Sequence, residues 1–382
     1  MRTMPRVVGW LRRSVLHVAW CVLCLLTACR VPGAVRPVVR MGLVAPFEGR
    51  YRYVGYDVFP AVRLALRQAN AAGGVGGYAV ELVAYDDGAD PLSAVEQARK
   101  LLADPEVVVV IGHFRDETTL AALATYADGG LPLVVPGLVN PSATDGAVFW
   151  WGVEADDLAA AMLDGLSSAA LVDDGGPLGR ALRALALEHG VTLAPLVAPG
   201  DPVGLAALSA ADPPAILCAA DPLPCGETLA ALRAAGWRGS FLGGPELAAA
   251  DFAAVAGEAV EGAAFVTPWP PPEDVEGSAD FIAAYREVSG GAPPGPLALP
   301  AYQATRRVLA ALAADIATHG TPSPPRVAAA LESSAADERP LSLYRYRYGP
   351  SDSRLRNSPV VIAQMSRPDG TGALAVSIRA QR

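Results

Sequence analysis

Few side chains in this sequence could form or break a covalent bond. The four histidines, His17, His113, His189 and His319, are scattered along the chain. They form no arrangement with a nucleophile that would suggest covalent or acid–base catalysis. The phosphate-binding loop, the GxSxG elbow and the zinc-binding HExxH pattern are also missing. The sequence therefore favours a binding protein, with an enzyme as a distant alternative.

Two short patterns could suggest a bound cofactor or metal, but ordinary structural roles fit them better. Residues 74–79 read Gly-x-Gly-x-x-Ala, yet they follow a predicted helix and precede a predicted strand, the reverse of the order in dinucleotide-binding folds. Asp86, Asp87 and Asp90 could bind a metal ion, but we expect them to cap a strand end and a helix start. We expect no cofactor and no metal.

Alternating strands and helices must position any binding residues. The β-branched run 107–111 is typical of a strand buried on both faces of a parallel sheet. A helix predicted over 56–72 ends at Gly73, because glycine adopts the left-handed conformation without a Cβ penalty. Asp90 and Pro91 are the predicted first residues of another helix. Strands and helices in alternation give a parallel sheet covered by helices.

The same alternation continues after residue 157, until the proline-rich segment 267–272 interrupts it. We interpret that segment as a crossover back to the first lobe. The sequence thus predicts an α/β protein of two Rossmann-like lobes with parallel central sheets, joined by a multi-crossing hinge. The N-terminal lobe would comprise 38–157 plus 269–348, and the C-terminal lobe 158–268 plus 349–382. A cleft between such lobes faces the carboxyl ends of the strands, where ligands bind.

Residues 1–28 have the layout of a secretory signal, with four arginines before an apolar core that is short for a membrane span. Leu-Thr-Ala-Cys at 26–29 resembles a bacterial lipobox with Cys29 as the lipidated residue; a plain signal peptide is the alternative. Residues 29–37 would be a tether. These features predict an extracytoplasmic protein, periplasmic or at the cell surface, attached to the membrane through a lipid anchor.

The charge and the cysteine content of the chain bear on its binding partners, on a disulfide and on zinc. The chain has 39 acidic and 30 basic residues, a formal net charge of −9 that becomes −13 once the four leader arginines are removed. This balance argues against nucleic acid as a partner. Cys218 and Cys225 could form a disulfide in an exported protein, although two unpaired thiols remain open. Their spacing, with no histidine nearby, does not suit zinc.

Several motifs in order and at familiar intervals carry a family resemblance. Together they resemble the branched-chain amino acid binding proteins, the type I extracytoplasmic solute receptors of ABC transporters. The matching segments are 44–49, 69–75, 81–87, 109–113, Asn140–Pro141 with Thr144, 243–247, 256–262 and 301–309. The resemblance implies the periplasmic binding protein-like I fold, closure of two lobes around a small ligand, and an ABC permease as partner.

The resemblance also implies ligand contacts in the loop after Ile111. In the family, small hydroxyl residues before the next helix hold the ligand's α-carboxylate. Here Asp116 stands at the serine position, and Thr119 is the nearest matching hydroxyl. Asp116 would fill the anion site with its own charge unless Arg115 turned inward to compensate. An ordinary helix cap with solvent-facing neighbours is the alternative.

Of the other ligand contacts that the resemblance implies, this sequence alters some and keeps others. Gly137 matches a backbone position of the family, whereas Val139 stands where a threonine hydroxyl is expected. Tyr53 lies beside the position of a usual aromatic ring, and Asp221 replaces a tyrosine. Glu246 matches the acid that holds the ligand's ammonium, although it could equally be a helix cap.

Asp116, Asp221 and Glu246 would make the cleft acidic, which suggests a cationic or amine-bearing ligand. The sequence therefore predicts a solute-binding lipoprotein that captures an amino-acid-like or amine-bearing molecule for an ABC importer. A sensory or scaffolding lipoprotein that signals to a membrane partner is the alternative.

Overall fold

The structure is a computed structural model that describes residues 36–137, 148–150, 152–335, 341–349, 360–366 and 375–377. From residue 39 onward the chain belongs to one compact unit. The predicted leader 1–28, Cys29, most of the tether 29–37, and Val139 lie outside the described residues.

The first sheet has the order β2-β1-β3-β4-β5 among the described strands. β1 pairs with β3, β3 with β4 and β4 with β5, all in parallel. Every residue of β3 is buried, and its side chains divide between two core clusters, as expected for a strand covered on both faces. The strands are β1 (Val38–Ala45), β2 (Ala79–Asp86), β3 (Val107–Gly112), β4 (Leu133–Val135) and β5 (Val148–Trp150).

Three helices follow strands of this sheet: α2 (Arg52–Ala71), α3 (Pro91–Leu102) and α4 (Asp116–Gly129). The Asp90 carboxylate accepts a 2.7 Å hydrogen bond from the backbone N–H of Ser93, which confirms the predicted cap of α3. α2 begins four residues before the predicted start at 56. It therefore carries Tyr53 within its first turn.

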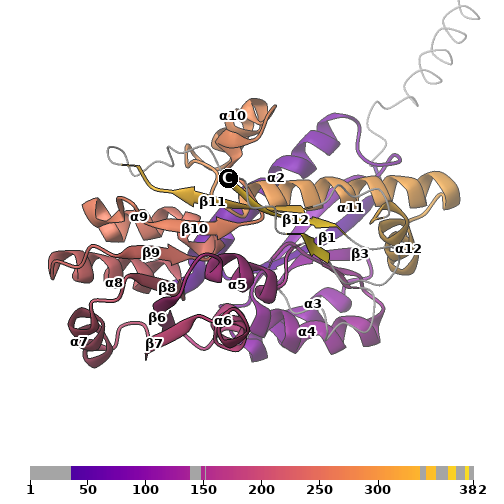
Figure 1. Cartoon of the computed structure of the whole chain (residues 1–382). Helices are drawn as coiled ribbons and strands as arrows, with labels where there is room; N and C mark the ends of the chain where they lie inside the picture. Colours follow the sequence, from indigo (N-terminus) through magenta and orange to yellow (C-terminus); the bar gives the residue numbers. More distant parts are fainter. Residues whose placement is uncertain are drawn as a thin grey trace, which may run out of the picture. The chain divides into compact units, whose positions relative to one another are not determined.

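The second sheet has the order β13-β12-β11-β10-β9-β8-β6-β7 among the described strands (Figure 1). Its strands are β6 (Ser168–Asp173), β7 (Thr192–Val197), β8 (Ala215–Ala219), β9 (Ser240–Gly243), β10 (Ala264–Thr267), β11 (Leu341–Arg347), β12 (Val360–Ser366) and β13 (Ala375–Ser377). The strands from β6 to β10 pair in parallel. The helices between them are α5 (Ala155–Leu163), α6 (Pro177–Glu188), α7 (Pro202–Ala211), α8 (Pro222–Ala234) and α9 (Ala250–Ala256).

After β10 the chain returns to the first sheet through α10 (Ala279–Val288), α11 (Ala298–His319) and α12 (Pro324–Ala335). Phe281, Val308 and Val327 from these three helices belong to the same core cluster as β1 and α2. The expectation that the proline-rich segment leads back to the first lobe agrees with this packing.

One boundary was predicted wrongly. We expected 341–348 in the N-terminal lobe, but β11 pairs antiparallel with β10 of the second sheet, and β12 and β13 extend that sheet further. The free edge of β10 presents backbone N–H and C=O groups that need partners, and β11 satisfies them.

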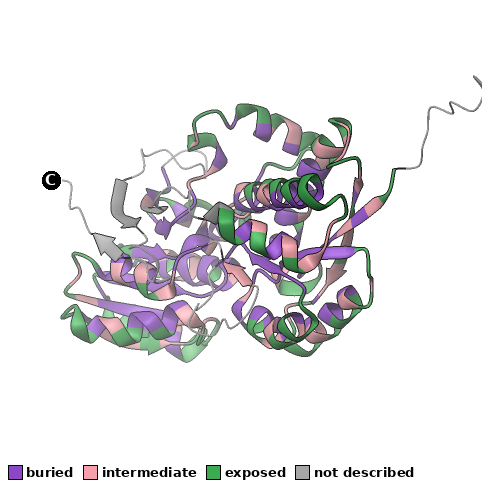
Figure 2. Ribbon diagram, turned by 90° about the vertical axis from the view of Figure 1, so that its right-hand side faces the viewer, coloured by how far each residue is buried: buried purple, intermediate pink, exposed green. Residues whose placement is uncertain are grey.

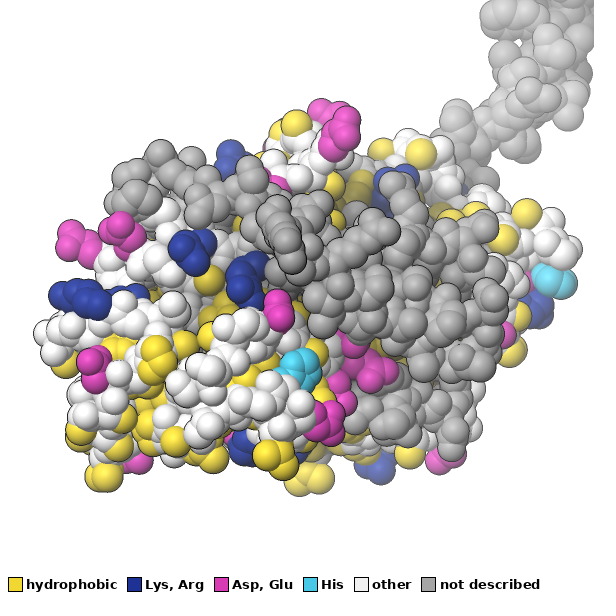
Figure 3. All heavy atoms as spheres, in the orientation of Figure 1, with side chains coloured by type: hydrophobic (Ala, Val, Ile, Leu, Met, Phe, Trp, Pro, Cys, Tyr) yellow, Lys and Arg dark blue, Asp and Glu magenta, His cyan; other side chains and the backbone are white. Residues whose placement is uncertain are grey.

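The two α/β sheets confirm the predicted fold class. Strands are largely buried and helices keep exposed outer faces (Figure 2). At the edge of the second sheet, Leu196 of β7 and Val203 of α7 are exposed, and apolar side chains gather there (Figure 3, lower left). Pro195 in this edge strand has no N–H to donate, which limits pairing with another chain. Within the described part of the chain, no helix is long and apolar enough to cross a membrane.

Candidate functional site

A cavity of about 120 Å³ lies where the carboxyl ends of strands from both sheets meet. Segments that follow β3, β4, β6, β8, β9 and β10 line it, together with the first turn of α2 and the segment before α11. Its volume is of the same order as the roughly 150 Å³ cavity that accepts benzene in an engineered protein. The space suits a small molecule, at the place where open α/β sheets bind ligands.

Six of the predicted site residues line this cavity: Tyr53, Arg115, Asp116, Gly137, Asp221 and Glu246. They come from five segments that are far apart in the sequence. Val139 lies outside the described residues.

Thr119 requires a correction. It is not among the lining residues, and its side chain is fully buried. It lies one turn into α4, where the rest of the fold covers the helix, and its hydroxyl has no hydrogen-bond partner among the described residues. Thr119 therefore does not line the cavity, and its contact with a ligand stays a prediction.

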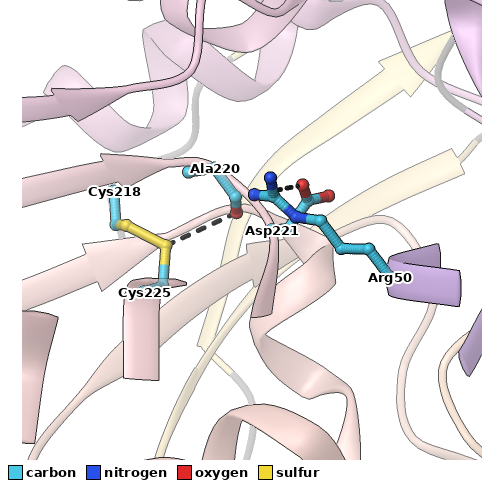
Figure 4. Close-up of a disulfide and its surroundings, with 5 residues drawn as sticks. All are labelled: Arg50, Cys218, Ala220, Asp221 and Cys225. Atoms are coloured by element: carbon cyan, nitrogen blue, oxygen red, sulfur yellow. Dashed lines mark hydrogen bonds and ion pairs between the residues drawn. A yellow bond between two sulfur atoms is a disulfide. The ribbon is translucent and has the colours of Figure 1, made fainter. Parts of the chain in front are cut away.

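Arg115 and Arg50 bridge the two sheets through Asp221. Arg115 Nη1 lies 3.1 Å from Asp221 Oδ1, and Arg50 Nη2 lies 2.9 Å from Asp221 Oδ2. Figure 4 shows Arg50 reaching Asp221 from the first-sheet side. Arg50 belongs to the short 3₁₀ helix η1 (Gly49–Tyr51), and Asp221 immediately precedes α8. These ion pairs hold the cavity walls together.

The Arg115 guanidinium also stacks on the Tyr51 ring, with Cζ 3.7 Å from the ring centroid. Burial alone would lower the pKa of Arg115, but Asp221 together with Tyr53, Tyr51 and Glu117 outweighs burial, and the pKa is raised. Arg115 is therefore firmly charged, and that charge is directed at Asp221.

Two other lining carboxyl groups have no such partner. Burial raises the pKa of Asp116 to about 7, with further contributions from the charges of Glu117 and Glu246. Burial likewise raises the pKa of Glu246 to about 7, assisted by Asp221 and Asp174. Both groups are thus close to half-ionised at neutral pH.

The backbone positions of these two acids differ from the expectation. Arg115 is the N-cap of α4 and makes no side-chain cap bond, so Asp116 is the first helical residue. Glu246 lies in the 3₁₀ helix η3 (Pro245–Ala248) rather than at the start of a long α-helix. Asp116 accepts no N-cap hydrogen bond, whereas the Glu246 carboxylate accepts a hydrogen bond from its own backbone N–H.

Apolar side chains form much of the remaining wall, among them Phe114, Leu178, Trp269 and Leu297. Trp269 and the acid Asp174 also line the cavity but were not predicted as site residues. Asp174 immediately follows β6, and Trp269 lies two residues after β10. The rule that ligands bind beyond the carboxyl ends of parallel strands could have found both.

Cys218 and Cys225 form a disulfide beside this site, which confirms the first of the two alternatives. The bond joins the end of β8 to the first turn of α8 and encloses the lining residues Ala219, Ala220 and Asp221 (Figure 4). Cys225 Sγ lies 3.4 Å from the carbonyl oxygen of Ala220. The disulfide therefore restrains the loop that presents Asp221.

Replacing both cysteines by alanine should lower the free energy of unfolding by about 2.5 kcal/mol, the loop-closure entropy of a loop of about eight residues. Urea unfolding with and without a thiol reductant measures it. The wild type should lose stability in reductant, and the double variant should show no response. Equal midpoints for wild type and double variant would contradict a stabilising role.

A buried hydrogen-bonded group supports the loop after β3. His113 Nδ1 lies 2.8 Å from Asp87 Oδ2, and His113 Nε2 lies 3.1 Å from the Tyr126 hydroxyl. All three side chains are buried and none lines the cavity. The group positions the segment that carries Phe114, Arg115 and Asp116 rather than meeting a ligand.

The acids considered for a metal also have structural partners. Asp86 accepts hydrogen bonds from the backbone N–H groups of Phe47 and Gly88, and Asp87 accepts one from Ala89. Over the described ranges no group of three or more His, Cys, Asp or Glu residues could hold a metal ion.

Two mostly parallel sheets with a cavity between the carboxyl ends of their strands define a ligand-binding protein of the periplasmic binding class. The family model described as "Periplasmic binding protein" matches residues 38–371. The chain belongs to this family, and the relatives it resembles are Leu/Ile/Val-binding proteins. Proteins of this family bind substrates outside the cytoplasm.

Among these relatives, Leu/Ile/Val-binding protein homolog 2 of Brucella abortus (strain 2308) is 32% identical over 126 residues, 33% of this chain and 34% of that protein. The aligned part thus spans about a third of the curated relative.

Solved structures of similar fold cover more of the chain. The branched-chain amino acid transporter substrate binding protein LivJ from Streptococcus pneumoniae, in complex with isoleucine, has a TM-score of 0.73 at 18% identity. It covers 85% of this chain and 99% of its own. A solute binding protein of an ABC transporter from Rhodopseudomonas palustris BisB5, in complex with 3,4-dihydroxy benzoic acid, has a TM-score of 0.73 at 17% identity, covering 85% and 96%. These neighbours share the fold with different ligands.

Proposed function

We propose that this protein is an extracytoplasmic solute-binding lipoprotein. It captures a small amino-acid-like or amine-bearing ligand between its two lobes and delivers it to an ABC importer. The observation that carries the proposal is the cavity between the two sheets, lined by apolar side chains and a few polar groups. Structural neighbours that are substrate-binding proteins of transporters support transport as the purpose of that binding.

The ion pairs between Asp221 and the two arginines support a capture mechanism. They join residues on opposite sides of the cavity, so they form when the lobes approach and break when they separate. Closure would bury the ligand, and the closed form would dock on the permease.

A matched pair of variants tests binding in the cavity. Leu178 of α6 lines the cavity and is 8% exposed, whereas Leu187 of the same helix is 86% exposed. Leu178→Trp should fill the space and abolish ligand binding, because overpacking leaves no room for a guest. Leu187→Trp should bind as the wild type does.

The measurement is isothermal titration with a panel of amino acids, amines and aromatic carboxylates, followed by thermal unfolding of each variant as a check on folding. Saturable binding at one ligand per chain that Leu178→Trp removes would support the proposal. Failure of every compound to bind, or equal binding by both tryptophan variants, would contradict it.

The membrane anchor requires a separate test. We propose lipidation at Cys29, supported by the lipobox resemblance at 26–29. The Cys29→Ser variant expressed in a bacterial host should move from the detergent phase to the aqueous phase on detergent partition. Unchanged partition would contradict the anchor. Co-purification with a permease would support delivery, whereas co-purification with a receptor kinase would favour sensing.

A further inference from the structure

The Asp116 carboxyl group is buried, unpartnered and part of the cavity wall. It is only 9% exposed, and within the described residues no hydrogen bond or ion pair engages it. Burying an ionised carboxylate without a partner costs several kcal/mol. A buried carboxyl group without a partner at the first helical residue of α4 indicates that a bound ligand supplies the missing partner.

Among the described residues no neighbouring cation forms an ion pair with Asp116, although the charges of Arg115 and Arg180 act to lower its pKa. Arg115 is next in the chain, but it contacts Asp221 at 3.1 Å, lies 3.9 Å from Glu117 and stacks on Tyr51. Arg50 is also engaged by Asp221. Arg115 and Arg50 are thus committed to the bridge between the lobes, and Arg180 Nη1 donates a hydrogen bond to the Gly175 carbonyl oxygen.

Glu246 lies close enough that its charge contributes to the raised pKa of Asp116. Both pKa values are about 7, so the two groups together carry about one negative charge at neutral pH. A ligand carboxylate beside them would meet that charge, whereas one positive charge would neutralise it. Phe114, Leu178 and Trp269 provide apolar surface for the rest of the molecule.

We propose that the cavity selects a small organic monocation with an apolar body and no carboxylate, and that its ammonium group lies between Asp116 and Glu246. The inference rests on the proposed function and narrows its ligand class. An alkylamine is the simplest example.

A matched pair of ligands tests the inference. Leucine and 3-methylbutylamine share the same branched apolar chain and ammonium group and differ in the carboxylate alone. Isothermal titration at pH 7.5 should give an affinity for the amine about 100-fold above that for leucine, the size expected from removing a like charge beside a buried carboxylate.

Variants of Asp116 extend the test. Asp116→Asn keeps the side-chain shape and removes the charge, so it should weaken amine binding by about 30-fold. Asp116→Ser frees the N-terminus of α4 for an anion and should reverse the preference toward leucine. Asp156→Asn is the matched control, because Asp156 is an exposed first-turn acid of α5 outside the cavity. It should bind the amine as the wild type does.

The pH profile gives an independent readout. Between pH 6 and pH 8 each carboxyl group with a pKa of about 7 changes from mostly protonated to mostly ionised. Amine affinity should therefore rise about tenfold over this range, and Asp116→Asn should flatten the rise. A ligand carboxylate bound by protonated Asp116 would show the opposite slope.

The outcomes separate this inference from the proposed function. Tighter binding of leucine than of the amine by the wild type overturns the ligand class and leaves solute binding intact. Amine affinity that falls with pH, or that Asp116→Asn leaves unchanged, also overturns it. If neither compound binds, the inference is wrong, and the Leu178→Trp comparison over the full panel decides whether solute binding fails with it.

Discussion

Replacing Asp57 by alanine is expected to lower the free energy of unfolding by about 3–5 kcal/mol. Asp57 is a buried residue of α2. Its carboxylate accepts hydrogen bonds from the backbone N–H of Gly295 at 2.7 Å and of Leu297 at 2.6 Å. The Tyr285 hydroxyl donates to it at 3.3 Å. Alanine would leave these donors without their acceptor, and each unsatisfied buried donor costs about 1–3 kcal/mol.

The same substitution should weaken ligand binding. Leu297 lines the cavity as the residue before α11, and Asp57 ties that residue to α2. Without the hydrogen bond between Leu297 and Asp57, this wall of the cavity can move. We therefore expect a lower affinity for any ligand as well as a lower free energy of unfolding.

Urea unfolding measures the stability change. Glu96→Ala is the matched control, because Glu96 is a helical acid that is exposed and paired only with Lys100; its loss should cost less than about 0.5 kcal/mol. A decrease for Asp57→Ala no larger than that of Glu96→Ala would show that Asp57 does not organise this wall.

The unliganded protein is expected to lose stability as the pH rises from about 4 to about 8. Burial raises the pKa of Asp116 from 3.8 to about 7 in the folded state. The folded protein therefore binds a proton at pH values where the unfolded chain has released it. The stability that this group contributes is complete below about pH 4 and is lost as the pH rises through 7.

The upper bound for Asp116 is about 4 kcal/mol, from about three pKa units at 1.4 kcal/mol each. Glu246, raised to about 7, and Asp57, raised to about 6, act with the same sign. Asp116→Asn should reduce the slope, because the amide does not titrate. Urea unfolding of wild type and variant at pH 5, 6, 7 and 8 is the measurement, and parallel curves would contradict the assignment.

Local signals in the sequence were sufficient for most elements. The valine run of β3 is apolar enough to require burial on both faces, and Asp90 can satisfy the first N–H groups of α3 by itself. Such features depend on residues within a few positions of each other, so their structure follows from the sequence directly. The three-residue strand β5 was missed, because so short a segment shows almost no alternation of apolar and polar residues.

The candidate site was predicted in part. Six of its lining residues were named from the sequence, largely through the family resemblance. Thr119 does not line the cavity, because helical spacing alone does not say which side of the first turn the fold covers. Asp174 and Trp269 were missed, because each becomes a site residue only when the end of its strand lies beside the ends of the other strands.

By itself the sequence determined the α/β alternation, the pair of sheets and the acidic character of the cleft, since periodicity, capping and charge are properties of short segments. Only the tertiary structure decided that Arg50 and Arg115 form ion pairs with Asp221, while Asp116 and Glu246 form no ion pair with any described residue. It also decided that β11 completes the second sheet. These outcomes depend on contacts between residues about 75 to 170 positions apart, and the packing of whole elements sets such contacts.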